Sequence, residues 1–272
     1  MELDQGLDLS GPFYDWDFGL SGENEAIERV DLATEEVTVA VIDSGLDGEH
    51  EIFTGTTVKT GWNTLDDDID AYDDVGHGTH IAGIIASKAP GVSIIPYKIV
   101  NKNGGKLSNV LEAFSLALEE DVDVINTSFG LAQESYALGL LVDEAYEQGV
   151  IIISAAGNNA KDDGFYPAQN EHTIAVASVD SDGNKLPKSN YGNWIDVAAF
   201  GYHVRSSLPD GEYGYLSGTS QSTAVVSAAV VRLLQSAHTG GEWTYSSILS
   251  ALKAGSEKSI STGELAGTAI IQ

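Results

Sequence analysis

The chain has 272 residues, with 41 acidic against 13 basic side chains and a formal net charge of −28 at pH 7. Its hydrophobic content of 42% is sufficient for a folded core, so this charge does not indicate a disordered chain. The absence of cysteine excludes disulfide scaffolds, thiolate zinc sites and iron–sulfur clusters. A negative field of this size also repels phosphates, which makes nucleic acid and anionic membranes poor partners.

Residues 1–272 are predicted to form one domain, because no repeat, linker or change of composition marks a boundary. No run approaches the roughly 18 apolar residues of a membrane helix, and residues 1–19 lack the basic and apolar parts of a signal peptide. We therefore expect a soluble, monomeric chain without a membrane partner. The acidic composition suits a high-salt medium and an ordinary acidic surface equally well.

Short apolar runs rich in Val and Ile alternate with longer segments of helical spacing. The strand-like runs are residues 37–43, 92–100, 121–128, 149–156 and 172–179. The helix-like segments are residues 77–86, 107–119, 134–148, 220–234 and 245–253, and Gly149 is predicted to stop the third of them. This alternation predicts an α/β fold, with a doubly wound, mostly parallel sheet covered by helices on both faces. In such sheets ligands bind beyond the carboxyl ends of the strands.

Two candidate catalytic residues stand at a predicted strand end and a predicted helix start. Asp43 closes the first strand, where a carboxylate is also a common turn residue. His77 opens a helix between two glycines, and the helix dipole there favours the neutral imidazole that a general base requires. A capping or packed histidine is the structural alternative. His80 follows three residues later, so a metal pair with His77 is a further alternative, although no HExxH motif accompanies it.

Two further candidates occupy similar positions later in the chain. Ser220 begins a helix of small residues, where free backbone N–H groups suit a nucleophile that generates an oxyanion, although most such serines are ordinary caps. Asn158 follows the fourth strand, and its amide could donate to a developing oxyanion. The order Asp, His, Asn, Ser at sheet edges and helix starts is hard to obtain by chance.

Four sequence blocks carry a resemblance to a known family. They are VAVIDSGLD at 39–47, GHGTHIAG at 76–83, SAAGN at 154–158 and SGTS at 217–220, and they are similar to the signature blocks of the subtilisin-like serine proteases. This resemblance implies that Ser220 is the nucleophile, His77 the general base and Asp43 the group that orients and stabilises the imidazolium. It also implies that Asn158 and the Ser220 N–H form the oxyanion hole, and that His80 is structural.

The resemblance further implies a peptide or protein substrate that is bound as an added β-strand, with no cofactor needed for catalysis. The residues expected to bind it are Asn103, Gly104 and Gly105 on one edge, Ser128, Phe129 and Gly130 on the other, and Ser154, Ala155, Ala156 and Phe165 around the primary specificity pocket. Phe165 stands where many relatives carry a small residue, which predicts a shortened pocket that prefers small or medium side chains before the cleaved bond.

A run of carboxylates precedes His77. Its members Asp66, Asp68, Asp70, Asp73 and Asp74 are candidates for a structural Ca²⁺ site. An acidic subsite for basic substrate residues and plain solvated charge are the alternatives. The tight calcium site of many relatives is not expected, because residues 86–94 are shorter than the corresponding loop.

The family resemblance predicts a serine endopeptidase in its mature form, secreted by preference and cytoplasmic as the alternative, without signal peptide or pro-segment in the chain. Two positions depart from the family pattern. Ala224 replaces the usual proline, and Phe200 replaces the proline of Ala-Pro-Gly. These departures place the chain outside the mainstream secreted branch. A processing peptidase or peptide macrocyclase is an alternative with the same acyl-enzyme. A catalytically silent binding protein is another, since fold does not imply function. The last alternative is a metal hydrolase that uses His77 and His80.

Overall fold

The computed structural model describes residues 36–236, 243–256, 258–261 and 263–272. Its strands are β1 (Thr38–Asp43), β2 (Thr57–Val58), β3 (Trp62–Asn63), β4 (Ser93–Lys98), β5 (Val100–Asn101), β6 (Gly104–Gly105), β7 (Val124–Thr127), β8 (Ile151–Ala155), β9 (Thr173–Val179), β10 (Val197–Phe200), β11 (Val204–Leu208), β12 (Glu212–Leu216), β13 (Lys258–Ser259) and β14 (Ala269–Ile271). Its α-helices are α1 (His77–Lys88), α2 (Leu107–Glu119), α3 (Tyr136–Glu147), α4 (Thr219–Gln235) and α5 (Tyr245–Gly255), and a 3₁₀ turn, η1, spans Glu51–Phe53.

Ten of the described strands form one sheet in the order β13-β14-β10-β9-β8-β7-β1-β4-β2, with β3 paired to β4. Only the β13–β14 pair is antiparallel, and all other pairs in this sheet are parallel. The mostly parallel α/β sheet predicted from the sequence is therefore confirmed. The chain order along the sheet reverses at β1, which separates β7 from β4.

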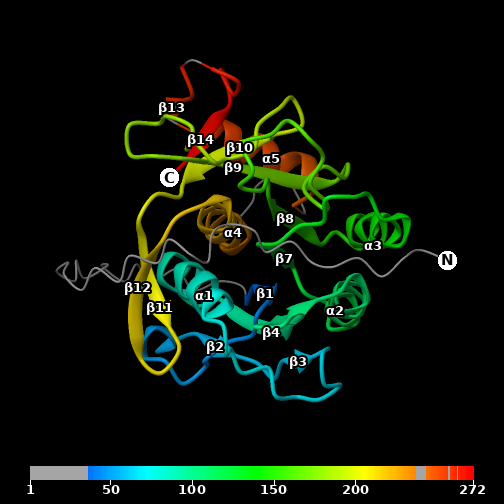
Figure 1. Ribbon diagram of the computed structural model, residues 1–272. Coiled ribbons are helices and arrows are strands. Elements are labelled where there is room, and N and C mark those ends of the chain that lie inside the picture. The colour runs from blue at the N-terminus through cyan, green and yellow to red at the C-terminus, as the bar shows by residue number, and fades with distance from the viewer. Residues whose placement is uncertain (1–35, 237–242, 257, 262) are drawn as a thin grey trace.

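Helices cover both faces of this sheet. Figure 1 shows α1 and α4 on one side and α2 and α3 on the other. Strand β1 illustrates this arrangement. All six of its residues are buried, and its four apolar residues alternate between two cores. Val39 and Val41 pack with residues of α1 and α4, whereas Ala40 and Ile42 pack with residues of α2 and α3. Burial on both faces explains why the strand has a continuous apolar sequence.

The predicted elements agree with the observed ones except at their ends. The predicted strand 92–100 is divided into β4 and β5, and the third helix begins two residues late because Ser135 caps it, its hydroxyl accepting the Leu138 N–H at 3.1 Å. Gly149 follows that helix with a φ of +81°, as its predicted role as a stop requires. In the part of the chain that the structure describes, no helix has the length and apolar character to cross a bilayer. The sequence argument on residues 1–19 lies outside the described residues.

Candidate active site

Asp43 and His77 meet at the carboxyl end of β1. Asp43 is the last residue of that strand and is fully buried, and His77 is the first residue of α1. The His77 Nδ1 lies 2.8 Å from Oδ1 and 2.9 Å from Oδ2 of Asp43. The N–H of Ser44 donates to Asp43 Oδ1 at 2.7 Å. These bonds fix the carboxylate, which in turn orients the imidazole. The other ring nitrogen of His77, Nε2, therefore lies on the side of the ring away from Asp43.

The electrostatic surroundings of His77 favour the protonated ring. Burial acts to lower the pKa of His77, but the charge of Asp43, the hydrogen bond to it and the charge of Asp73 together hold this pKa above its ordinary value. The sequence argument from the helix dipole, which favoured the neutral ring, is outweighed here. The reason is that the Asp43 carboxylate is in direct contact, whereas the dipole acts only through partial charges.

Ser220 reaches the same edge of the sheet from α4, of which it is the second residue. Its hydroxyl donates to the Ser128 carbonyl oxygen at 3.1 Å, and the Ser128 hydroxyl donates back to the Ser220 carbonyl oxygen at 3.3 Å. Ser128 directly follows β7, which is the neighbour of β1. These two bonds fix the start of α4 beside the strand end that carries Asp43.

Asn158 follows β8, the next strand along the sheet. Its Oδ1 accepts hydrogen bonds from the Thr219 N–H at 3.0 Å and from the Thr219 hydroxyl at 3.3 Å. Thr219 directly precedes Ser220, so the Asn158 side chain lies at the start of α4. Because its oxygen is held by Thr219, its amide nitrogen is the atom able to donate to a reacting group beside Ser220.

The segments expected to bind substrate extend from the strands on either side of β1. Gly104 and Gly105 form β6 in a small hairpin after β4, and the N–H of Asn103 donates to Asn101 Oδ1 at 2.8 Å in the same hairpin. Residues 128–130 follow β7 and are buried. The two predicted edges therefore flank the strand that carries Asp43.

Phe165 occupies the space between two of the predicted pocket walls. A Cβ added at Gly130 would lie 2.0 Å from the Phe165 ring, and one added at Gly157 would lie 3.1 Å from it. The ring is only 5% exposed. Ser154 and Ala155 end β8, and Ala156 follows them, all buried. The ring thus lies directly against the backbone that follows β7 and β8.

The members of the acidic run lie in different surroundings. Asp66, Asp68 and Asp70 are exposed, and Asp74 pairs with Lys98. Across the described residues, which include the entire run, no three His, Asp or Glu side chains are grouped so that they could hold a metal ion. The calcium site therefore stays a prediction from the sequence. Asp68 takes part in a local turn, in which its Oδ1 accepts the Asp70 N–H at 2.9 Å.

Asp73, which the sequence groups with the other candidate calcium ligands, differs from them in its surroundings. It is fully buried and accepts hydrogen bonds from the first residues of α1 and from Ser44, the residue after Asp43. Nothing in the sequence marks Ser44 for this contact. The signal that could have found Asp73 is its position just before a helix start, where carboxylates commonly accept free backbone N–H groups.

His80 lies in the first part of α1 and is fully buried. Its Nε2 is 3.1 Å from the Val204 carbonyl oxygen of β11. Burial, together with the charge of His77, lowers the pKa of His80 to about 3, so the ring is neutral near pH 7. His80 is therefore packed between α1 and the β11–β12 hairpin.

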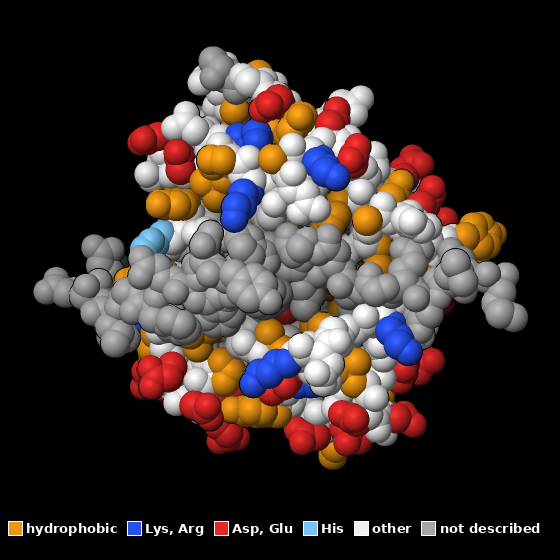
Figure 2. Space-filling view, in the orientation of Figure 1, with side chains coloured by type: hydrophobic (Ala, Val, Ile, Leu, Met, Phe, Trp, Pro, Cys, Tyr) orange, Lys and Arg blue, Asp and Glu red, His pale blue; other side chains and the backbone are white. Residues whose placement is uncertain are grey.

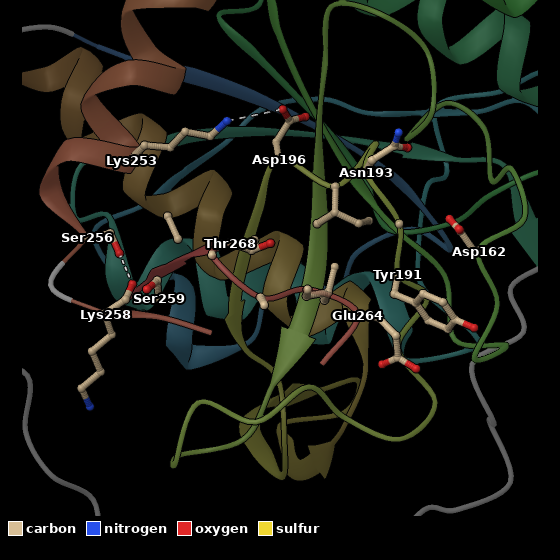
Figure 3. Close-up of a pocket in the computed structure, with 16 residues that line it drawn as sticks. Asp162, Tyr191, Asn193, Asp196, Lys253, Ser256, Lys258, Ser259, Glu264 and Thr268 are labelled. Atoms are coloured by element: carbon tan, nitrogen blue, oxygen red, sulfur yellow. Dashed lines mark hydrogen bonds and ion pairs between the residues drawn. The ribbon is translucent and has the colours of Figure 1, made fainter. Parts of the chain in front are cut away.

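A separate cavity of about 1130 Å³ lies beside the C-terminal hairpin, and none of its lining residues belongs to the predicted site. Figure 3 shows its polar lining, with the Lys253 Nζ directed at Asp196 across 3.8 Å. Tyr191 and Glu264 line another part of it. Its lining residues come from the segments on either side of β9, from the last turns of α5 and from the chain after it. The candidate site, in contrast, is built on the ends of β1, β7 and β8 and on the starts of α1 and α4.

The chain has relatives among known proteins. The model of the Subtilase family matches residues 34–262. The thermophilic serine proteinase of Bacillus sp. (strain AK1) is 37% identical over 209 residues, covering 73% of this chain and 52% of that protein. Thermitase of Thermoactinomyces vulgaris is 35% identical over 209 residues, covering 73% of this chain and 74% of that protein. The chain thus spans about half the length of several curated relatives that it matches.

The fold has similar solved structures. A cold adapted subtilisin-like serine proteinase superposes with a TM-score of 0.78 and 30% identity, over 86% of this chain and 87% of that one. A lanthipeptide protease superposes with a TM-score of 0.79 over 86% and 85%, and at 24% identity this likeness concerns the fold alone. On the family model, the sequence identity and the shared fold, this chain belongs to the subtilase family.

Proposed function

We propose that the chain is a serine endopeptidase in which Ser220, His77 and Asp43 act as the catalytic triad. The observation that carries this proposal is the contact of His77 Nδ1 with Asp43 at the end of β1, with Ser220 fixed at the neighbouring strand end. Membership of the subtilase family and the names of the relatives, which are proteinases, support it.

The proposed reaction has two stages, acylation of Ser220 and release of the acyl group. The Ser220 oxygen attacks the carbonyl carbon of the peptide bond while His77 takes the hydroxyl proton, and the imidazolium formed is stabilised by Asp43. The C–N bond breaks as His77 returns the proton to the leaving amine. Water then releases the acyl group by the same steps, which restores Ser220. The Asn158 amide and the Ser220 N–H donate to the oxyanion of each tetrahedral intermediate.

The substrate in this proposal is an extended peptide that lies between the segment after β4 and the segment after β7. Glycines at 104 and 105 suit such binding, because a bare backbone allows a peptide strand to approach closely. The bare side of Gly130 is instead filled by the Phe165 ring. The buried ring of Phe165 favours a small or medium side chain before the cleaved bond.

Denatured casein and a fluorogenic peptide series, each with and without phenylmethylsulfonyl fluoride, test the proposal. Ser220→Ala should lower kcat by at least about 10⁴-fold, since the nucleophile is lost. The control is Ser115→Ala, which removes a hydroxyl from α2, on the face of the sheet opposite to α1 and α4. This variant should behave like the parent. Labelling of Ser220 by a fluorophosphonate reports the assembled triad independently of substrate choice. A folded parent that neither cleaves peptides nor takes up the label would overturn the proposal in favour of a binding role.

A narrow processing role is the second candidate, favoured by the Phe165 ring in the predicted pocket. In that case the fluorophosphonate labels Ser220 while casein remains uncut. Mass spectrometry of the products from a peptide library then separates hydrolysis, which adds one water, from macrocyclisation, in which an internal amine releases the acyl-enzyme without net addition of water.

A further inference from the structure

The buried carboxylate of Asp73 is the most highly bonded acidic group around the candidate site. Its Oδ1 accepts the Ser44 hydroxyl at 2.8 Å, the Gly76 N–H at 2.8 Å and the Val75 N–H at 3.0 Å. Its Oδ2 accepts both the N–H and the hydroxyl of Thr79, each at 2.8 Å. Burial raises the pKa of Asp73, while the hydrogen bonds from Gly76, Thr79 and Ser44 act to lower it. Five donors directed at two oxygens suit the ionised carboxylate, because a carboxyl proton would meet one of these donors.

These bonds link two pieces of chain that are far apart in the sequence. Ser44 directly follows Asp43, and its own N–H holds the Asp43 carboxylate. The Ser44 hydroxyl, while donating to Asp73, accepts the N–H of Gly78 at 2.9 Å. Gly78 directly follows His77 in the first turn of α1. The relative placement of Asp43 and His77 therefore depends on a bonded group whose centre is Asp73.

We propose that Asp73 is a positioning residue, which holds the Asp43 carboxylate and the His77 imidazole in productive contact through Ser44 and the first turn of α1. This inference rests on the proposed function, because it assigns Asp73 a part in the same reaction. It goes beyond the triad and the oxyanion hole, since Asp73 touches neither the substrate nor the reacting atoms.

Asp73 has an electrostatic effect that a purely structural group would lack. The charged groups that act on His77 are Asp43 from β1 and Asp73 from the loop before α1. His80 on α1 is neutral near pH 7, because burial and the charge of His77 lower its pKa to about 3. The Asp73 charge acts with that of Asp43 against the burial of the ring, and so contributes to the raised pKa of His77. Removal of this charge must move that pKa downwards, which is a readout independent of stability.

The central test is Asp73→Asn, which keeps the shape of the side chain but removes the charge and one acceptor. We expect kcat to fall by about 10- to 100-fold with a nearly unchanged KM, because the base is misplaced while substrate contacts remain. The acid limb of the pH profile of kcat/KM should move to lower pH. The matched control is Asp67→Asn, which removes an equal charge from the same loop at an exposed residue and should match the parent.

Ser44→Ala separates position from charge, because it cuts the link to Gly78 while Asp73 remains ionised. We expect kcat to fall without movement of the acid limb. An NMR titration of His77 in a Ser220→Ala background supplies the same readout without activity, and there Asp73→Asn should lower the pKa of His77 while Asp67→Asn should not.

The outcomes distinguish the two proposals. A parent that fails to cleave peptides and to take up fluorophosphonate contradicts the proposed function, whatever Asp73 does. An active parent whose Asp73→Asn variant keeps kcat within twofold and an unmoved acid limb contradicts the positioning role alone. If Asp73→Asn does not fold, Ser44→Ala decides, and parental kcat in that variant would overturn the inference.

Discussion

At the scale of single residues, the proposed mechanism makes the pair of Asp43 and His77 responsible for the pH range of the reaction. The imidazole of His77 must be neutral to accept the Ser220 proton. Burial acts to lower the pKa of His77, but Asp43 and Asp73 hold this pKa above its ordinary value of 6.5. Activity is therefore lost as the pH falls through this raised value. The acid limb of kcat/KM should have its midpoint above pH 6.5, measured on a fluorogenic peptide across overlapping buffers. A midpoint below 6.5 would show that burial dominates.

The proposed oxyanion donor, Asn158, gives a second prediction at this scale. Asn158→Ala removes the amide beside Ser220, and kcat should fall by about 100- to 1000-fold, a range known for subtilisin itself. KM should change little, because the donor acts on the charge that develops in the transition state. Single-turnover kinetics measures the acylation step directly. An equal rise of KM with constant kcat would indicate a ground-state contact instead.

Phe165 gives a prediction about specificity. Phe165→Ala removes a buried ring from between two backbone walls and should shift the preferred residue before the cleaved bond towards Phe and Tyr. The variant should also lose about 3–5 kcal/mol of stability, since a buried aromatic side chain leaves a cavity. Rates on a peptide series that varies this one residue provide the measurement. If the parent already cleaves best after Phe and Tyr, the shortened-pocket interpretation fails.

At the scale of elements, the site depends on how closely α1 approaches the end of β1. A Cβ added at Gly78 would lie 2.2 Å from the Gly45 carbonyl oxygen, so the helix rests on bare backbone there. Gly78→Ala should therefore push the first turn away, destabilise the protein by about 1–3 kcal/mol and lower kcat. Thermal melts and peptide kinetics on the same samples would measure both effects.

The matched control for this change is Gly255→Ala at the end of α5, where an added Cβ meets nothing within 4 Å. It should be neutral or stabilise the protein by up to about 1 kcal/mol, because alanine is the better helix former. An equal loss of stability in the two variants would mean that the close contact of α1 with Gly45 has no special importance.

At the scale of the whole molecule, the net charge of −28 governs the response to salt. Figure 2 shows Asp and Glu side chains along much of the periphery of the visible face, with scattered Lys and Arg. NaCl should raise the melting temperature, because screening of the carboxylates relieves their repulsion over about 10 Å at 0.1 M. A melting temperature independent of NaCl contradicts this. CaCl₂ at matched ionic strength is the control, and a larger rise with it would indicate a specific ion site.

Much of this protein could be predicted from the sequence. Buried strands such as 37–43 and 172–179 are continuous Val- and Ile-rich runs because both of their faces are covered, so the parallel sheet follows from local composition. The positions of Asp43, His77, Asn158 and Ser220 also followed, because strand ends and helix starts are marked locally and strand ends of a parallel sheet meet at one edge.

Other features required the tertiary structure. In sequence Asp73 is one carboxylate in an acidic run, and only folding decides that it is buried beside Ser44 while Asp66 and Asp70 face solvent. The pKa of His77 likewise depends on distances to two carboxylates, which outweigh the helix dipole seen in the sequence. The sequence by itself determined which elements form and which reactive side chains end them, since those follow from local patterns. The tertiary structure alone decided which charges lie together, because electrostatic and packing energies depend on separation in space.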